Sequence, residues 1–278
     1  MVAKVTTSAP TVSLRLPGAN QQYRLTCRVQ TGPTTLGTVA LDQDTVARDP
    51  RIPAPMIDQE AAATAELMTD FRGYVIEAAA GTGANGITSL FLASLLRNEI
   101  ANTPPLPGQS PRAARERELA RSDAAVRERE RGGAPEADVL NASIGVGQIK
   151  PSTAATVTGA TPWVEQDRND REPGRRRALA NYLGLSPAQQ REILTLLAWP
   201  RGNITTAARL LARLKNRSNR YPGLTQAAFG ANERAVKIVA TEYNIGASTT
   251  HEALAQPSTY GDTVWTNMQD PLMRQFFP

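Results

Sequence analysis

The chain has 278 residues and a formal net charge of +5, and 41% of its residues are hydrophobic, which suits one large globular domain or a domain with an accessory segment. Its only cysteine is Cys27 and its only histidine is His251, which excludes a disulfide framework, a Cys/His zinc site and most catalytic pairs of histidine with serine or cysteine. Any catalysis must therefore depend on carboxyl, hydroxyl, amide or basic groups, and no cofactor or metal is expected.

The positive net charge favours an acidic partner, which can be a nucleic acid, an anionic membrane surface or an acidic polysaccharide. No apolar run approaches the length of a membrane-spanning helix, and the opening residues lack the continuous apolar core of a secretory signal. We therefore expect no transmembrane segment and no cleavable signal.

Residues 1–55 are predicted to form a β-rich or extended arm. They are rich in Thr, Val, Gly and Pro, and the alternating pieces TVSLRL, YRLTCRV and LGTVAL are separated by turn signals. After Pro55 the pattern becomes helical, with Asp58 as a plausible N-cap and the GTGANG cluster as a stop. The expected fold class is mainly α, with a helical domain over 56–278.

Four further segments carry helical signals. Apolar residues recur at helical spacing in ITSLFLASLLRNEI, from Ile87 to Ile100. Ser186 and Asn203 are expected to begin two helices, and ANERAVKIVATEYN should end at Gly246. The charged insertion at about 104–137 alternates Arg and Glu, and such a run predicts a solvated helix or a mobile segment.

Glu99 is the most informative carboxyl residue. It lies four positions after Leu95 and three after Leu96, so it projects near the apolar side of its helix. It also lies at the helix C-terminus, where the helix dipole is unfavourable to a negative charge. Both effects favour the protonated form that a general acid needs near neutral pH. The alternative is a glutamate on a solvated last turn.

The loop NASIGVGQIKPSTA, from Asn141 to Ala154, contains two glycines that let the backbone approach another group closely. A phosphate-binding loop would need a preceding strand and a following helix in a parallel sheet, and the chain shows no such alternation. We therefore do not expect a nucleotide site here.

Taken in order, LLRNE, SIGVGQIKPSTA, NITTAARLLARL and ATEYNIGA resemble the soluble lytic transglycosylases and goose-type lysozymes, which are peptidoglycan glycosidases with a lysozyme-like helical fold. The family pattern is a helix ending in the catalytic glutamate, a Gly-x-x-Gln loop, an Asn-led helix and a Tyr-Asn-x-Gly segment. The residues that match it are Glu99, Gly145, Gln148, Pro151, Thr153, Ala154, Asn203, Tyr243, Asn244 and Gly246.

The resemblance covers roughly residues 87–247, and the sequence departs from the family in three places. Ile100 follows the glutamate where serine is frequent, and Gly147 stands where many members have methionine. The segment between Glu99 and Ser143 is also longer than the family pattern, because it contains the charged insertion.

The resemblance implies cleavage of the β-1,4 bond between N-acetylmuramic acid and N-acetylglucosamine in peptidoglycan glycan strands. Glu99 would protonate the glycosidic oxygen, and Tyr243 would orient the acid or the substrate. The remaining implied substrate-binding residues are Ser143, Gly145, Val146, Gly147, Gln148 and Asn244. The glycines would admit a sugar ring, and the Gln148 amide would offer both a donor and an acceptor.

Two mechanisms stay open. A lytic transglycosylase needs no second protein carboxylate, because the acetamido group and the C6 hydroxyl of the substrate complete the displacement. A hydrolase needs a base or nucleophile across the bond, and Glu136, Asp138 and Glu165 are the candidates near the loop. Three aromatic residues are interpreted either as sugar-stacking or as core residues: Trp163, Trp199 and Tyr182.

The expected localisation follows from the resemblance to enzymes that degrade the cell wall, together with the lack of a predicted secretory signal. The protein would be made in the cytoplasm and act in the periplasm of a target cell, as an antibacterial toxin delivered by a secretion system and opposed by an immunity protein. The alternative function is a catalytically silent wall-binding or structural component of a phage or injection apparatus. A nucleic-acid partner is not expected, because the positive net charge is the only feature that supports one.

Overall fold

The computed structural model of the chain describes residues 21–31, 34–45, 59–103, 111–164, 171–247 and 249–277. The chain divides into two compact units, Met1–Met56 and Ile57–Pro278. The expected helix cap at Asp58 and the strand piece TVSLRL lie outside the described residues.

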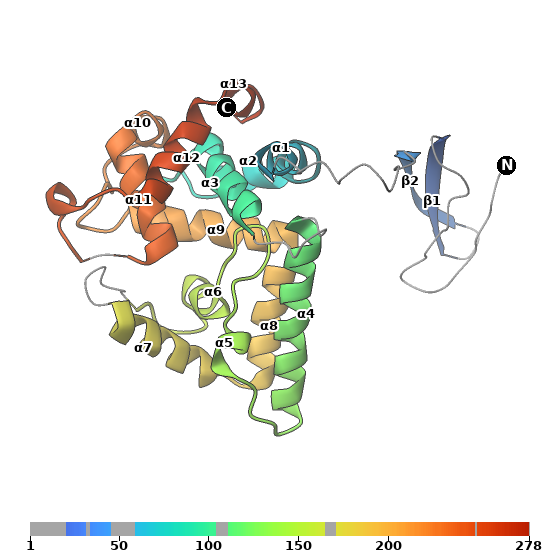
Figure 1. The fold of residues 1–278 in the computed structure, drawn as a ribbon, viewed down its shortest axis with the longest axis horizontal. Helices are drawn as coiled ribbons and strands as arrows, with labels where there is room; N and C mark the ends of the chain where they lie inside the picture. The colour runs from blue at the N-terminus through green and yellow to red at the C-terminus, as the bar shows by residue number, and fades with distance from the viewer. Residues whose placement is uncertain are drawn as a thin grey trace, which may run out of the picture. The chain divides into compact units, whose positions relative to one another are not determined.

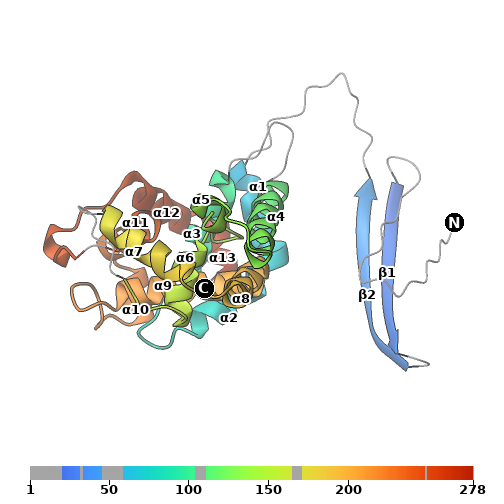
Figure 2. The ribbon, with the colours of Figure 1, turned by 90° about the horizontal axis from the view of Figure 1, so that it is seen from below.

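The first unit contains a two-stranded antiparallel hairpin of β1 (Gln21–Thr31) and β2 (Thr34–Thr45), drawn in blue in Figure 2. The register pairs Tyr23 with Gln43 and Leu25 with Leu41, and it shifts between Val29 and Gln30. The predicted strand pieces YRLTCRV and LGTVAL both lie in this hairpin.

The second unit confirms the prediction of a mainly α fold. Its described elements, in chain order, are α1 (Gln59–Glu66), the π-helical turn η1 (Leu67–Phe71), α2 (Arg72–Ala80), α3 (Ser89–Asn102), α4 (Pro111–Glu130), α5 (Ala137–Leu140), α6 (Pro151–Thr158), α7 (Arg171–Leu183), α8 (Pro187–Ala198), α9 (Pro200–Lys215), α10 (Gln226–Gly230), α11 (Glu233–Ile245), the 3-10 turn η2 (Glu252–Leu254), α12 (Thr259–Gln269) and α13 (Pro271–Phe276).

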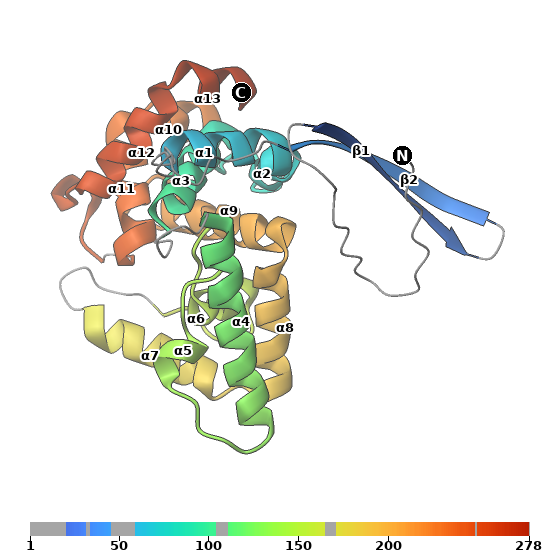
Figure 3. The same cartoon turned by 45° about the vertical axis from the view of Figure 1, so that its right-hand side comes forward.

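Helix α9 lies at the centre of this unit. Figures 1 and 3 show it between α1–α3 and α10–α13 on one side and α4–α8 on the other, and it packs against α2, α6, α8 and α11. Its predicted apolar stripe is fully buried and consists of Ile204, Ala207, Ala208, Leu211 and Leu214. The burial of these side chains joins the two helical groups.

Two of the three downstream helix signals agree with the structure. Ser186 caps α8 in a capping box with Gln189, and α11 ends at Gly246, which has a positive φ of 96°. The predicted helix start at Asn203 is wrong, because α9 already begins at Pro200, whose ring suits the first turn of a helix. This leaves the Asn203 side chain available for contacts outside its own helix.

The charged insertion forms helix α4, which Figures 1 and 3 show alongside α8. Its inner side is buried at Ala114, Ala125 and Val126, although the helix has few large apolar residues. Ser122 Oγ donates to the Val139 carbonyl oxygen at 3.1 Å, and Arg115 pairs with Glu66. The run is therefore a packed helix that keeps its charged residues largely on the outer side.

Lys215, the last residue of α9, is a fully buried cation. Its ammonium donates to the carbonyl oxygens of Asn85, Tyr221 and Leu224 at 2.8, 3.1 and 2.7 Å, and to Asn216 Oδ1 at 2.9 Å. Burial lowers the pKa of Lys215, because the charged form loses its hydration. The contacts join α9 to the loop before α3 and the turn before α10.

We predict that Lys215→Met lowers the free energy of unfolding by roughly 3 kcal/mol, because several buried carbonyl oxygens lose their donor. The matched control is Lys237→Met, which removes ion pairs to the exposed carboxyls of Glu233 and Asp262 and should cost much less. Denaturant unfolding of the two variants measures the difference, and equal losses would contradict the role given to Lys215.

Candidate functional site

Glu99 lies in the last turn of α3, next to the buried side chains of Leu95, Leu96 and Ile100. Helix α3 begins at Ser89 with Thr88 as its N-cap, and its apolar residues pack into the core. The Glu99 carboxyl is therefore held at the edge of the core, where little water reaches it. Burial raises the pKa of Glu99 to about 7, so a substantial fraction of the carboxyl is protonated at neutral pH.

Tyr260 on α12 is the direct partner of this carboxyl. Its hydroxyl donates a hydrogen bond to Glu99 Oε1 and lowers the pKa of Glu99 in opposition to the larger effect of burial. Tyr243 on α11 also lies close, since the Glu99 charge helps to raise the tyrosine pKa. The Tyr243 hydroxyl, however, donates to the Gly147 carbonyl oxygen at 2.6 Å. The tyrosine hydroxyl that bonds to the acid is therefore that of Tyr260, and orientation of the substrate by Tyr243 stays a prediction.

Glu99 opens into a cavity of roughly 250 Å³, hereafter the Glu99 cavity. Five of the residues predicted for catalysis or binding line it, although they come from distant parts of the chain: Glu99, Ser143, Gln148, Tyr243 and Asn244. Trp163 also lines it, with the Arg213 guanidinium 4.0 Å from the centre of its ring, whereas Tyr182 is buried in the core and Trp199 is exposed. The cavity contains both hydrogen-bonding groups and an aromatic surface.

The loop between α5 and α6 forms a tight hairpin that is held in place by the side chain of Asn203 on α9. Ile144 and Ile149 pair through their backbones at 3.0 and 3.1 Å. The buried Asn203 amide accepts from Gly147 N at 2.7 Å and donates to the carbonyl oxygens of Ile144 and Leu197 at 2.9 and 3.1 Å. One side chain therefore satisfies three main-chain groups and sets the position of the loop.

The two loop glycines make room for side chains of the protein itself. A Cβ on Gly145, which has a φ of +76°, would lie 2.2 Å from Asn203 Nδ2. A Cβ on Gly147 would lie 3.0 Å from the Tyr243 hydroxyl and 3.1 Å from Asn203 Oδ1. The glycines are thus required by the packing of Asn203 and Tyr243, and the expected approach of a sugar ring to the loop stays a prediction.

Several other predicted site residues lie outside the Glu99 cavity. Gly145 and Val146 line a second cavity of roughly 430 Å³ beside α4, and Gly147 is buried. Glu136 and Asp138 are exposed and do not line the Glu99 cavity, and Glu165 lies outside the described residues. Of the three predicted candidates for a second carboxylate, the two that the structure describes do not line the Glu99 cavity.

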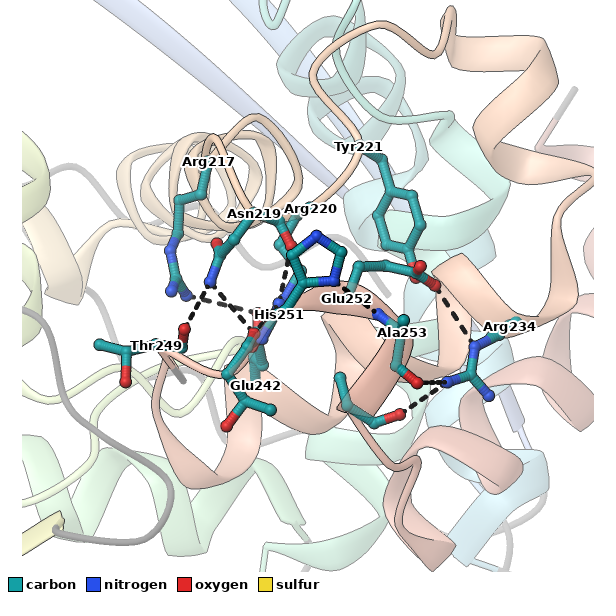
Figure 4. Close-up of polar contacts among 12 residues, drawn as sticks. Arg217, Asn219, Arg220, Tyr221, Arg234, Glu242, Thr249, His251, Glu252 and Ala253 are labelled. Carbon is teal, nitrogen blue, oxygen red and sulfur yellow. Dashed lines mark hydrogen bonds and ion pairs between the residues drawn. The ribbon is translucent and has the colours of Figure 1, made fainter.

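Among the described residues, a second carboxyl lines the Glu99 cavity, that of Glu242, which sequence reasoning missed. It is 3% exposed and forms ion pairs with Arg220 and Arg217, both of them buried or nearly so. The Arg220 guanidinium also donates to two main-chain carbonyl oxygens, that of Asn219 at 2.8 Å and that of Thr250. Figure 4 shows this group of side chains. These ion pairs connect the cavity wall to the segment that follows α9.

The same network joins three segments around α11. Asn219 Nδ2 donates to the Thr249 and Thr250 carbonyl oxygens at 3.0 and 3.1 Å, and the Tyr221 hydroxyl donates to Glu252 Oε1 at 2.9 Å. Arg234 Nε forms an ion pair with Glu252 Oε1 at 3.3 Å. Because Glu242 precedes Tyr243 on α11, the network also fixes the end of α11 that faces the cavity.

Tyr260 was missed because it follows the segment covered by the family resemblance. Its only sequence signal is a tyrosine in an amphipathic helix, a pattern that usually indicates a core residue. Glu242 could have been noticed as a carboxyl on the inner side of its helix, next to the Tyr-Asn pair.

Within the described ranges, no three or more His, Cys, Asp or Glu side chains cluster closely enough to hold a metal ion. In the same part of the chain, no helix is both long and apolar enough to cross a membrane. Compared with protein-family models, with curated proteins and with solved structures, the chain finds no match.

We predict that Asn203→Ala lowers the free energy of unfolding by about 3 kcal/mol, because three main-chain groups lose their partner. Asn203→Asp is the sharper test. It keeps an acceptor for Gly147 N but places a carboxylate against two carbonyl oxygens, so it should destabilise at least as much as alanine. Urea unfolding measures both, and wild-type stability of the aspartate variant would contradict this role.

The Glu99 pKa predicts a specific pH dependence of stability. Because the folded pKa is about 7 and the ordinary value is 4.5, the native state binds the proton more tightly. The contribution of Glu99 to stability therefore falls as the pH rises from about 4.5 to 7. Glu99→Gln should match the wild type near pH 4 and be more stable at pH 8 by roughly 1–3 kcal/mol.

Urea unfolding at the two pH values measures the effect. Glu136→Gln removes an exposed carboxyl outside the Glu99 cavity and controls for the loss of one negative charge. A constant difference between wild type and Glu99→Gln at both pH values would show that the carboxyl is not buried as described.

Proposed function

We propose that the chain cleaves the β-1,4 glycosidic bond between N-acetylmuramic acid and N-acetylglucosamine in bacterial peptidoglycan, with Glu99 as the single general acid and base. The observation that carries the proposal is a protonatable, half-buried Glu99 in one cavity with Gln148, Tyr243 and Asn244. These are the residue types that the resemblance to lytic transglycosylases and goose-type lysozymes assigns to the acid and the substrate wall.

The environment of Glu99 suits proton donation to a leaving oxygen. Its pKa of about 7 leaves a large protonated fraction near neutral pH, and Tyr260 fixes the rotation of the carboxyl through Oε1. As the bond from C1 to the glycosidic oxygen breaks, that oxygen receives the proton and Glu99 becomes a carboxylate. The Tyr260 hydroxyl then stabilises the new charge by its hydrogen bond.

The contacts of the second carboxyl favour the transglycosylase outcome. Glu242 is engaged in ion pairs with Arg220 and Arg217, which hold its side chain in place beside them and not beside a bound water. The substrate can supply the missing groups. Its acetamido oxygen stabilises C1, and its C6 hydroxyl then attacks C1 while the Glu99 carboxylate accepts the hydroxyl proton. The product is a 1,6-anhydro end, and no water is consumed.

The test is to incubate purified peptidoglycan sacculi with wild type, Glu99→Gln and Glu136→Gln. Glycan release should fall by at least about 100-fold in Glu99→Gln, because the amide cannot supply the proton. Glu136→Gln should retain release, since Glu136 is exposed and does not line the Glu99 cavity. Mass spectrometry should detect anhydro ends.

Equal release by wild type and Glu99→Gln would refute the proposal. Reducing ends in place of anhydro ends would assign a muramidase with a second catalytic group. Binding to sacculi without glycan release by the wild type would instead support the catalytically silent wall-binding function.

A further inference from the structure

The start of helix α6 forms one wall of the Glu99 cavity. Lys150 precedes this helix as its N-cap residue, and it lines the cavity together with Ser152 and Thr153 of the first turn. None of these three residues takes part in the proposed proton transfer, and the family resemblance assigns none of them to the acid or to the sugar wall. Their chemistry nevertheless belongs to a binding site.

Lys150 carries the only basic side chain among the described residues that line the Glu99 cavity. It is exposed, and its ammonium forms no ion pair or hydrogen bond with the described part of the chain. The two cavity carboxyls have other partners, since Glu99 accepts from Tyr260 and Glu242 forms ion pairs with arginines. The Lys150 ammonium can therefore pair with an anionic group that enters the cavity.

Ser152 supplies a hydroxyl to the same wall. The residue is only 4% exposed although it lines the cavity, and its Oγ has no hydrogen-bond partner among the described residues. Its backbone N–H is already used, because it donates to Asn141 Oδ1 at 2.9 Å. Leaving a buried polar group without a partner costs free energy. The free hydroxyl therefore indicates a place that a ligand or an ordered water fills.

The N-terminus of α6 adds to the positive charge of Lys150. Helix α6 has eight residues, and the N–H groups of a first helical turn have no acceptor within their own helix. The Lys150 side chain cannot cap them, since it has no acceptor atom. The aligned peptide dipoles give this end of the helix a partial positive charge. An anionic group is therefore stabilised here by the helix and by the lysine together.

The backbone at Lys150 is fixed on both sides. The preceding residue, Ile149, exchanges two backbone hydrogen bonds with Ile144 at 3.0 and 3.1 Å, in the hairpin that Asn203 holds. On the other side, the Lys150 carbonyl oxygen accepts from Ala154 N at 3.0 Å. The backbone of the site is thus in place before a ligand binds, which lowers the cost of binding.

We propose that Lys150, Ser152 and the N-terminus of α6 form a carboxylate-binding subsite of the Glu99 cavity. The ammonium pairs with the carboxylate, and the Ser152 hydroxyl donates a hydrogen bond to it. On the proposed function, on which this choice of ligand rests, the carboxylate belongs to the peptidoglycan strand. Its source is the lactyl group of N-acetylmuramic acid, which is free where no peptide is attached, or the attached peptide.

The first experiment measures binding without activity, by nitrogen-15 NMR titration of the full chain with two pairs of compounds. One pair is N-acetylmuramic acid and its carboxamide, and the other is N-acetylmuramoyl-L-alanine and its carboxamide. Within each pair, the carboxylate is replaced by a neutral group. The wild type should bind the carboxylate form of at least one pair about tenfold more tightly at low salt. Preference in the first pair assigns the lactyl carboxylate, and preference in the second pair alone assigns the peptide carboxylate.

Variants of the subsite test which residues give this preference. Lys150→Met should abolish it, whereas Lys150→Arg should keep it within about threefold, because the positive charge remains. Ser152→Ala should reduce it by about threefold, through the loss of one hydrogen bond. Arg209→Met is the matched control, since it removes a positive charge from an exposed position of α9 that does not line the Glu99 cavity.

Three results overturn the proposal. The first is equal binding of carboxylate and carboxamide forms by the wild type, or no binding of any of them. The second is a preference that survives in Lys150→Met or stays unchanged in Ser152→Ala. The third is an equal loss of preference in Arg209→Met, because the effect is then one of net charge.

The second experiment measures KM and kcat for glycan release from sacculi. Lys150→Met should raise KM by about tenfold with a smaller effect on kcat, because the subsite binds the substrate and does not transfer the proton. A KM for Lys150→Met equal to that of the wild type overturns the assignment of the carboxylate to the peptidoglycan strand. Absence of release by the wild type refutes the proposed function, while the NMR titration still decides whether the subsite binds a carboxylate.

Discussion

The Asn203 amide is the interaction on which the candidate site depends. Its oxygen and nitrogen contact three main-chain groups of the 141–149 region and of the end of α8, and no water is needed to satisfy them. A buried polar group with all partners in place stabilises one arrangement strongly, because any other arrangement leaves several of them unsatisfied. This arrangement requires glycine at positions 145 and 147, because a Cβ on Gly145 or Gly147 would come too close to the Asn203 side chain.

Two carboxyl groups among the described residues line the Glu99 cavity, and their surroundings differ. Glu99 lies beside apolar residues of α3 and has one hydrogen-bond donor, the Tyr260 hydroxyl, so burial dominates and its pKa rises. Glu242 instead forms ion pairs with Arg220 and Arg217. Such a difference in environment is how a protein assigns different roles to chemically similar groups. It supports a single acid as the reactive group.

The charged insertion links the packing of the fold to the geometry of the site. Helix α4 packs on α8 through small buried residues and carries its arginines and glutamates mostly on the outer side. Arg115 is the exception, because it is buried and paired with Glu66. The insertion also borders the second cavity, which Gly145 and Val146 of the loop line.

The sequence by itself determined the helical class, the capped start of α8, the buried stripe of α9 and the candidacy of Glu99. These features depend on residues within a few positions of one another, through helix periodicity and capping. Only the tertiary structure decided the hydrogen-bond partners. Tyr260 lies 161 positions from Glu99 and Asn203 lies 56 positions from Gly147, and the chain must fold before either pair meets. Local patterns carry no information about such pairs, which is why the contact from Tyr260 to Glu99 and the packing of the loop glycines against Asn203 could not be predicted.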